Sequence, residues 1–102
     1  MDYKNAIVYS EPYYKLIQEE SIESKEVYYK FMNWLLGEFD LYLQDASSGL
    51  KIYYPDGRLS INKRAGLTME IIITSKSNIV CEKKYYHLVS IYNQVKQTLR
   101  YH

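Results

Sequence analysis

The sequence has little cysteine, proline or glycine. Its 102 residues include one Cys, two Pro and four Gly. With Cys81 alone, no disulfide can form within the chain, which argues against the small disulfide-framed folds of secreted proteins. So few proline and glycine residues indicate no flexible or low-complexity segment. We therefore expect residues 1–102 to form one domain.

Long apolar runs are also missing from the sequence. No stretch approaches the roughly 18 consecutive apolar residues that a membrane span needs. The first residues show no basic segment followed by a long apolar stretch, which is the pattern of a signal peptide. We therefore expect an intracellular protein with no membrane partner.

Motifs that carry common chemistry are absent too. The sequence contains no G-x-G-x-x-G, P-loop or G-x-S-x-G pattern. Cys81 and His87 would point about 120° apart on a helix, so a core cysteine is expected at position 81. One Cys and two His are too few for a zinc centre. We expect no enzyme, no cofactor and no metal site.

Charge is balanced overall but uneven along the chain. The formal net charge is +1. Through Asp45, nine acidic residues face four basic ones, whereas from Ala46 onward nine basic residues face three acidic ones. The two halves are electrically complementary and can pack against each other. A groove between them would carry opposite charge on its two walls.

Tyrosine is the abundant residue. The chain has 13 Tyr, and eight of them form four adjacent pairs, at 13–14, 28–29, 53–54 and 85–86. Adjacent residues on a strand or helix cannot all face inward, so several rings must lie at the surface. Tyrosine offers a large contact area and a polar tip at low entropic cost, and it is enriched in binding surfaces.

Periodicity predicts the elements of the first half. A strand is expected at 6–10, whereas 13–20 fits either a strand or a helix. A helix is expected with Ser24 as its N-cap and Gly37 as its C-cap. Its apolar face comprises Val27, Tyr28, Phe31, Trp34 and Leu35. Strict alternation in "EFDLYLQD" predicts a half-buried strand at 38–45 with Phe39, Leu41 and Leu43 on one face.

The second half reads as a hairpin, a strand and a helix. "LKIYY" and "RLSIN" flank Pro-Asp-Gly, which is typical of a tight turn. "LTMEIIIT", at 67–74, predicts a central strand of a sheet. A helix follows to about residue 100. Its apolar arc comprises Cys81, Leu88, Ile91, Tyr92, Val95 and Leu99.

The two helical Tyr-Tyr pairs align at an offset of 57 residues. Strand-then-helix order is shared at this offset, while identity is weak, so duplication and chance similarity both stay open. We expect an α+β fold of two similar β-plus-helix motifs, about 1–45 and 58–102, joined by a β-hairpin region. It would have antiparallel strands and two main amphipathic helices.

Four features of the chain carry a resemblance: the Tyr-Tyr pairs, "MEIIIT", the lone Cys81 and the short Gly- and Pro-poor length. In these features the chain resembles the small orphan proteins of filamentous viruses of hyperthermophilic archaea, of the Acidianus lipothrixvirus kind. The resemblance is one of overall character. It implies a viral protein in the host cytoplasm, made of two similar motifs, with an interaction role.

The leading hypothesis is a protein- or peptide-binding module with a Tyr-rich groove between the two motifs. Its candidate lining is Tyr28, Tyr29, Trp34, Tyr85 and Tyr86. The first tyrosine of each pair leans toward the apolar arc of its helix, and the second lies off it.

Two alternatives stay open. One is non-specific nucleic-acid binding through the basic second half, with Lys63, Arg64, Lys83 and Lys84 as candidates. The other is a homodimeric structural protein.

Overall fold

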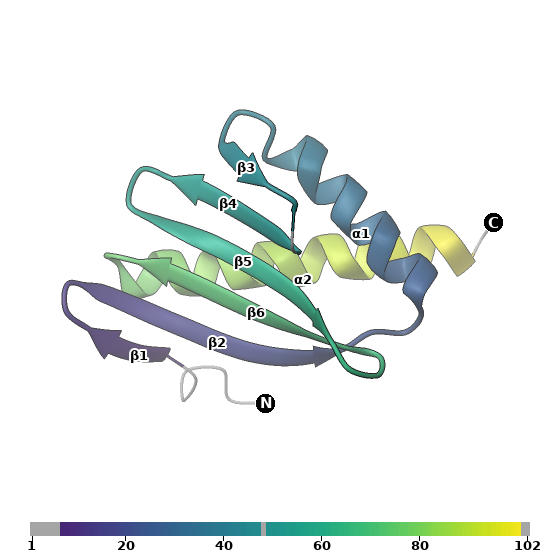
Figure 1. Ribbon diagram of the computed structural model, residues 1–102, viewed down its shortest axis with the longest axis horizontal. Coiled ribbons are helices and arrows are strands. Elements are labelled where there is room, and N and C mark those ends of the chain that lie inside the picture. Colours follow the sequence, from purple (N-terminus) through teal and green to yellow (C-terminus); the bar gives the residue numbers. More distant parts are fainter. Residues whose placement is uncertain (1–6, 48, 101–102) are drawn as a thin grey trace.

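The computed structural model describes residues 7–47 and 49–100 (Figure 1). Within them, six strands form one antiparallel sheet that is accompanied by two helices, which is the expected α+β fold. The elements are β1 (Ile7–Ser10), β2 (Tyr13–Ser21), α1 (Lys25–Glu38), β3 (Leu43–Asp45), β4 (Leu50–Tyr54), β5 (Gly57–Arg64), β6 (Thr68–Ser75) and α2 (Asn78–Arg100). The spatial order is β1-β2-β6-β5-β4-β3.

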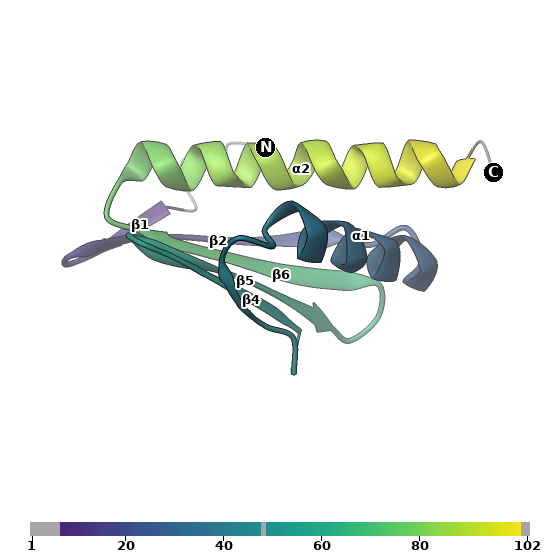
Figure 2. The same cartoon turned by 90° about the horizontal axis from the view of Figure 1, so that it is seen from above.

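Both helices lie on the same side of the sheet (Figure 2). Strand β6, in the middle of the sheet, pairs with β2 on one side and β5 on the other, so the prediction of a central strand is confirmed. Met69, Ile71 and Ile73 of β6 share the covered face and are at most 2% exposed. Phe31 of α1 and Leu88 of α2 belong to the same buried cluster. Full burial of such a side chain contributes about 1.5–3 kcal/mol.

Segment 13–20, which fitted either a strand or a helix, is a strand. The register pairs Tyr14 with Ser75 and Ser21 with Thr68, so β2 is paired with β6 along nearly its whole length. β1 pairs with the start of β2. Of the strand expected at 6–10, Ala6 lies outside the described residues, as do residues 1–5 of the first expected motif.

The predicted strand at 38–45 is wrong in its first half. α1 continues through Gly37 to Glu38, and the N–H of Phe39 still donates to the Leu35 carbonyl at 3.0 Å. Gly37 is therefore within the helix, and Phe39 is the C-cap. Phe39 is 8% exposed whereas Leu41 is 94% exposed, so they do not share a buried strand face. The helix continues because Phe39 fills a core position one turn after Leu35.

The other end of α1 is as expected. The Ser24 side chain accepts a hydrogen bond from the Val27 N–H at 3.1 Å and caps the helix. Val27, Tyr28, Phe31 and Leu35 are buried, as predicted. Trp34 is 40% exposed, so its expected place on the buried face is wrong. It lies at the margin, where α1 faces α2 rather than the sheet.

The structure does not show an internal repeat. Strand-then-helix order does recur, as β2–α1 and β6–α2, but α1 has 14 residues and α2 has 23. The strands of the two segments are also direct neighbours in one sheet.

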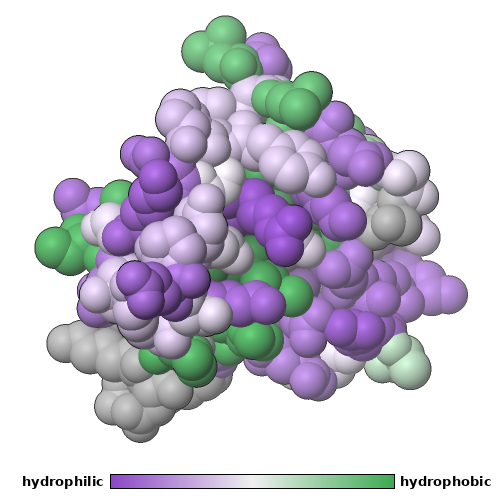
Figure 3. Space-filling view, turned by 60° about the vertical axis from the view of Figure 1, so that its left-hand side comes forward, coloured by the Kyte–Doolittle hydropathy of each residue, from purple (hydrophilic) through white to green (hydrophobic). Residues whose placement is uncertain are grey.

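The second face of the sheet carries no helix (Figure 2). Ile17, which points to this face, is 42% exposed. Figure 3 shows the end of the molecule where the β1–β2 and β4–β5 turns lie, and the open face, toward the right of that view, is largely hydrophilic. An open, mainly polar face is common in antiparallel sheets.

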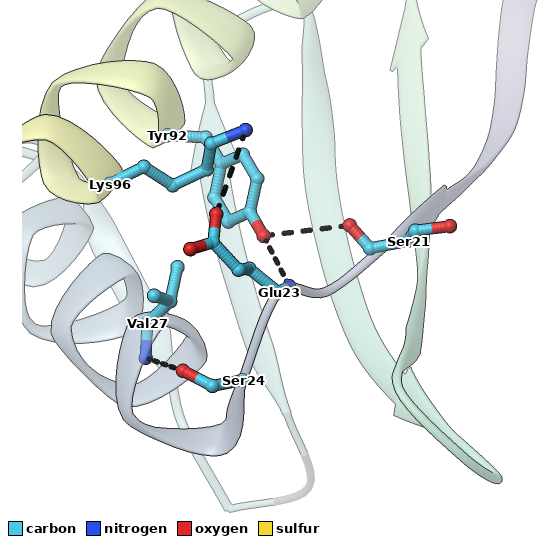
Figure 4. Close-up of polar contacts among 6 residues, drawn as sticks. All are labelled: Ser21, Glu23, Ser24, Val27, Tyr92 and Lys96. Atoms are coloured by element: carbon cyan, nitrogen blue, oxygen red, sulfur yellow. Dashed lines mark hydrogen bonds and ion pairs between the residues drawn. The ribbon is translucent and has the colours of Figure 1, made fainter. Parts of the chain in front are cut away.

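Tyr92 joins α2 to the β2–α1 connection (Figure 4). Its hydroxyl accepts a hydrogen bond from the Glu23 backbone N–H at 3.0 Å and donates to the Ser21 carbonyl at 3.5 Å. Lys96 lies one turn further along α2 and is 4.0 Å from the Glu23 carboxylate. The contacts position the start of α1 relative to α2.

Candidate functional site

The two helical tyrosine pairs each divide into a buried and an exposed ring. Tyr28 is 5% exposed and Tyr29 is 59% exposed, while Tyr85 is 7% exposed and Tyr86 is 50% exposed. This confirms the predicted division of each pair. A step of about 100° along a helix is enough to separate two adjacent rings in this way. Tyr29 and Tyr86 are thus the rings that a partner can reach.

The structure does not bring the five predicted site residues together in one groove. Tyr28 and Tyr29 line a hollow between α1 and the β4–β5 part of the sheet. Trp34 lines a hollow between α1 and α2. Tyr85 lines a smaller hollow between α2 and strands β2 and β6. Tyr86 borders none of these three hollows.

The hollow at Tyr28 and Tyr29 is about 560 Å³ and is called the α1 groove below. From α1 it receives Tyr28, Tyr29, Met32 and Leu36, and from the strands and their connections Ala46, Gly49, Leu50, Asn62 and Lys63. Met32 and Leu36 are partly buried against the core. The groove therefore has an apolar wall on α1 and a mixed wall on the sheet.

The groove exists because two neighbouring strands end at different levels. The β4–β5 ladder stops at the pair Leu50–Ile61. β5 continues to Arg64 with β6 as its partner. Asn62 and Lys63 therefore extend past the start of β4 and border the open space beside α1.

Gly49 brings the connection before β4 close to β5. Its φ is +91°, in the region that favours glycine, and a Cβ there would lie 2.5 Å from the Ile61 carbonyl oxygen. No other residue type fits this approach without a backbone shift. The glycine thereby fixes the position of one rim of the groove.

Polar groups surround the apolar wall. The pKa of Tyr28 is raised, first by burial and then by the nearby Tyr29. A hydrogen bond with the Lys63 backbone lowers this pKa and offsets part of the increase. The Tyr28 and Tyr29 rings meet edge to face at 5.5 Å. The Lys63 ammonium is 3.4 Å from the Gly66 carbonyl oxygen. The groove thus combines an apolar surface with tyrosine hydroxyls and one amine at its margin.

The four basic residues of the nucleic-acid hypothesis lie at opposite ends of the sheet. Lys63 and Arg64 precede the β5–β6 turn, whereas α2, with Lys83 and Lys84, starts where β6 ends. Arg64 forms an ion pair with Glu70. The four do not form one basic patch.

Lys84 is also engaged within the fold. Its ammonium lies over the Tyr54 ring, 4.4 Å from the centroid, and 5.9 Å from the centroid of Phe39. Burial lowers the pKa of Lys84. The residue therefore acts as a cation–π contact between α2 and the covered face.

Two important lining residues were not predicted from the sequence. Met32 and Leu36 follow Tyr28 at intervals of four residues, so all three lie along one flank of α1. That spacing is a readable signal for the helix wall. The strand wall carries no such signal, because it depends on where β4 ends relative to β5.

No protein-family description matches the chain, and no curated protein is detectably similar to it in sequence. In the part of the chain that the structure describes, no three His, Cys, Asp or Glu side chains gather so that they could hold a metal ion. Neither α1 nor α2, the helices of residues 7–47 and 49–100, combines the length and apolar character of a membrane span.

Proposed function

We propose that this chain is a protein- or peptide-binding module, and that its α1 groove receives an apolar side chain from an extended segment of the partner. The observation that carries the proposal is the groove itself, about 560 Å³ beside the exposed Tyr29 ring. Recognition pockets commonly combine an apolar wall with a few polar groups. Met32 and Leu36 would contact the inserted side chain.

The polar margin would orient the main chain of such a segment. The Lys63 ammonium, which lies 3.4 Å from the Gly66 carbonyl oxygen, has further donors for peptide carbonyl groups, whereas the Asn62 amide already donates to Ser60 Oγ at 3.1 Å. Tyr29 would cover the inserted side chain from the solvent side, as aromatic residues do at interface centres. We further propose, from the resemblance to proteins of archaeal viruses, that the partner is met inside the infected host cell.

Nucleic-acid binding through Lys63, Arg64, Lys83 and Lys84 has less support, because these residues are divided between two ends of the sheet. A mass measurement in solution distinguishes a homodimer from a monomer that binds another protein. In a homodimer, the inserted segment would come from a second copy of the chain, and a variant that blocks the groove would be monomeric.

A displayed peptide library tests the proposal. Peptides are selected on the wild-type protein, and their affinities are then measured for Met32→Glu and Asn33→Glu. Both variants add one carboxylate to α1, but Met32 lines the groove and the exposed Asn33 does not. We expect Met32→Glu to weaken the selected peptides by at least about tenfold, since a buried unpaired charge costs well over 1.4 kcal/mol.

Thermal melts establish that each variant is folded. Tyr29→Ala is a second, less disruptive variant, which removes one lining side chain of the same groove. Selected peptides that bind both groove variants as tightly as the wild type would place binding elsewhere on the chain.

A further inference from the structure

A row of four side chains crosses the open face of the sheet near the β4–β5 turn. Lys15 of β2 is the cross-strand partner of Thr74, Thr74 is that of Arg58, and Arg58 is that of Tyr53. Direct cross-strand partners have Cβ atoms about 4.5–5.5 Å apart and share one face of the sheet. Four different strands therefore place two cations, a hydroxyl and an aromatic ring side by side.

The cations of this row are available to a ligand. Within the described residues, neither Lys15 nor Arg58 takes part in an ion pair. The acidic residues of the open face on the neighbouring strands, Glu19 and Glu70, lie four residues further along, roughly 13 Å away. Glu70 is in addition paired with Arg64. Neither cation of the row therefore has a carboxylate as a direct cross-strand neighbour, and the nearest acidic residues of the chain at this end, Glu11 and Asp56, are in the turns rather than on the strands.

Thr74, between the two cations, has an unsatisfied hydroxyl. Its Oγ1 is buried and has no hydrogen-bond partner among the residues that the structure describes. A buried hydroxyl without a partner is costly. An anionic oxygen bound between Lys15 and Arg58 would supply the missing acceptor.

Two tyrosines complete the site. Tyr13 and Tyr53 line a hollow of about 410 Å³ together with Arg58 and Thr74. Tyr13 is 37% exposed. Tyr13 and Tyr53 stand on β2 and β4, whose backbones are three strand spacings or about 14 Å apart, with Thr74 and Arg58 on the two strands between them.

We propose that this open face binds the phosphate of a nucleotide between Lys15 and Arg58, with the attached base stacked on Tyr53 or Tyr13. Arginine forms bidentate contacts with phosphate, and aromatic rings on a polar, positively charged surface stack bases with little sequence preference. Two rings that flank one phosphate site suit a short single strand better than a free mononucleotide. The site lies on the face opposite the α1 groove and uses none of its residues.

The test measures binding of fluorescently labelled single-stranded oligonucleotides by anisotropy. With one phosphate neutralised between the two cations, affinity should fall about 2.5-fold between about 50 and 200 mM salt, since each neutralised phosphate contributes a slope of about −0.7 in single strands. Arg58→Ala should weaken binding and make that slope shallower. Tyr53→Leu should weaken binding about tenfold with the slope unchanged, because stacking is not a charge contact.

Arg64→Ala is the matched control, because it removes an arginine of the same strand that is already paired with Glu70. We expect its affinity and salt slope to equal those of the wild type. Inorganic phosphate and a mononucleotide are added as competitors. If the mononucleotide competes and inorganic phosphate at equal concentration does not, the base contact is supported. If the oligonucleotide binds more tightly than the mononucleotide, a single strand is the preferred ligand.

Three results would overturn the proposal. They are the absence of oligonucleotide binding at about 50 mM salt, where phosphate contacts are strongest, equal losses for Arg58→Ala and Arg64→Ala, and preferential binding of a peptide to this face. Thermal melts of Arg58→Ala and Tyr53→Leu verify that both variants are folded when their loss of binding is measured.

Discussion

The hydroxyl of Tyr85 donates a hydrogen bond to the carboxylate of Glu20 and joins α2 to β2 over a sequence separation of 65 residues. The buried tyrosine of the second Tyr-Tyr pair is therefore also a polar link between the layers. Burial raises the pKa of Tyr85, and the hydrogen bond and charge of Glu20 raise it further. Both partners occupy the covered side of the sheet, where the neutral hydroxyl is favoured over the phenolate.

This link predicts a loss of stability in alkali. Tyr85 ionises near its ordinary value of 10.0 in the unfolded chain and at higher pH in the folded one. Its contribution is fully present below about pH 10 and is lost as the pH rises above that value. We expect the free energy of unfolding, measured with urea, to fall less steeply above about pH 10 in Tyr85→Phe than in the wild type.

Tyr86→Phe is the control for the alkaline prediction, because it removes a hydroxyl from the exposed neighbour of Tyr85. At neutral pH, Tyr85→Phe should cost about 1–2 kcal/mol for the lost hydrogen bond. An identical alkaline slope in wild type and Tyr85→Phe would show that the link makes no contribution.

Two glycine-to-alanine substitutions should change stability in opposite directions. Gly37 is inside α1 with no atom within 4 Å of an added Cβ, so alanine should stabilise the fold by about 0.5–1 kcal/mol. A Cβ at Gly57 would be 1.8 Å from the Thr74 carbonyl oxygen. Gly57→Ala must displace backbone and should cost several times more, on the order of 3 kcal/mol. Urea unfolding of both variants checks the signs, and two destabilised variants would mean that α1 ends before Gly37.

Cys81 should be chemically inert in the folded protein. It is fully buried, and burial raises the pKa of its thiol. The thiolate is the reactive form. A chromogenic disulfide reagent at about pH 8.5, the ordinary pKa of a free thiol, should therefore react at once in concentrated urea and only slowly without it. Rapid reaction of the native protein would show that α2 separates easily from the sheet.

Short-range patterns predicted most of the fold. Alternation in β6 identified a central strand because Met69, Ile71 and Ile73 are separated by the period of a strand. Helical spacing likewise identified which tyrosine of each pair is buried. The same alternation misled at 38–45, because Phe39 and Leu41 alternate with polar residues although one is the cap of α1 and the other is exposed.

The candidate sites were harder to predict because they depend on strand order. Lys15, Thr74, Arg58 and Tyr53 become neighbours only because β2 and β4 flank the β6–β5 pair. Asn62 and Lys63 border the α1 groove only because β5 extends three residues past Ile61, which is the partner of the first residue of β4. Neither relationship leaves a local pattern in the sequence.

The central claim is that the α1 groove binds a partner through Tyr29. The most direct measurement compares the affinity of one library-selected peptide for wild type, Tyr29→Ala and Tyr86→Ala by calorimetric titration. The two tyrosines are similarly exposed, at 59% and 50%, but only Tyr29 lines the groove. We expect Tyr29→Ala to weaken binding at least about tenfold, as truncation of an aromatic anchor does, and Tyr86→Ala to leave it unchanged. Equal affinity of wild type and Tyr29→Ala would contradict the account.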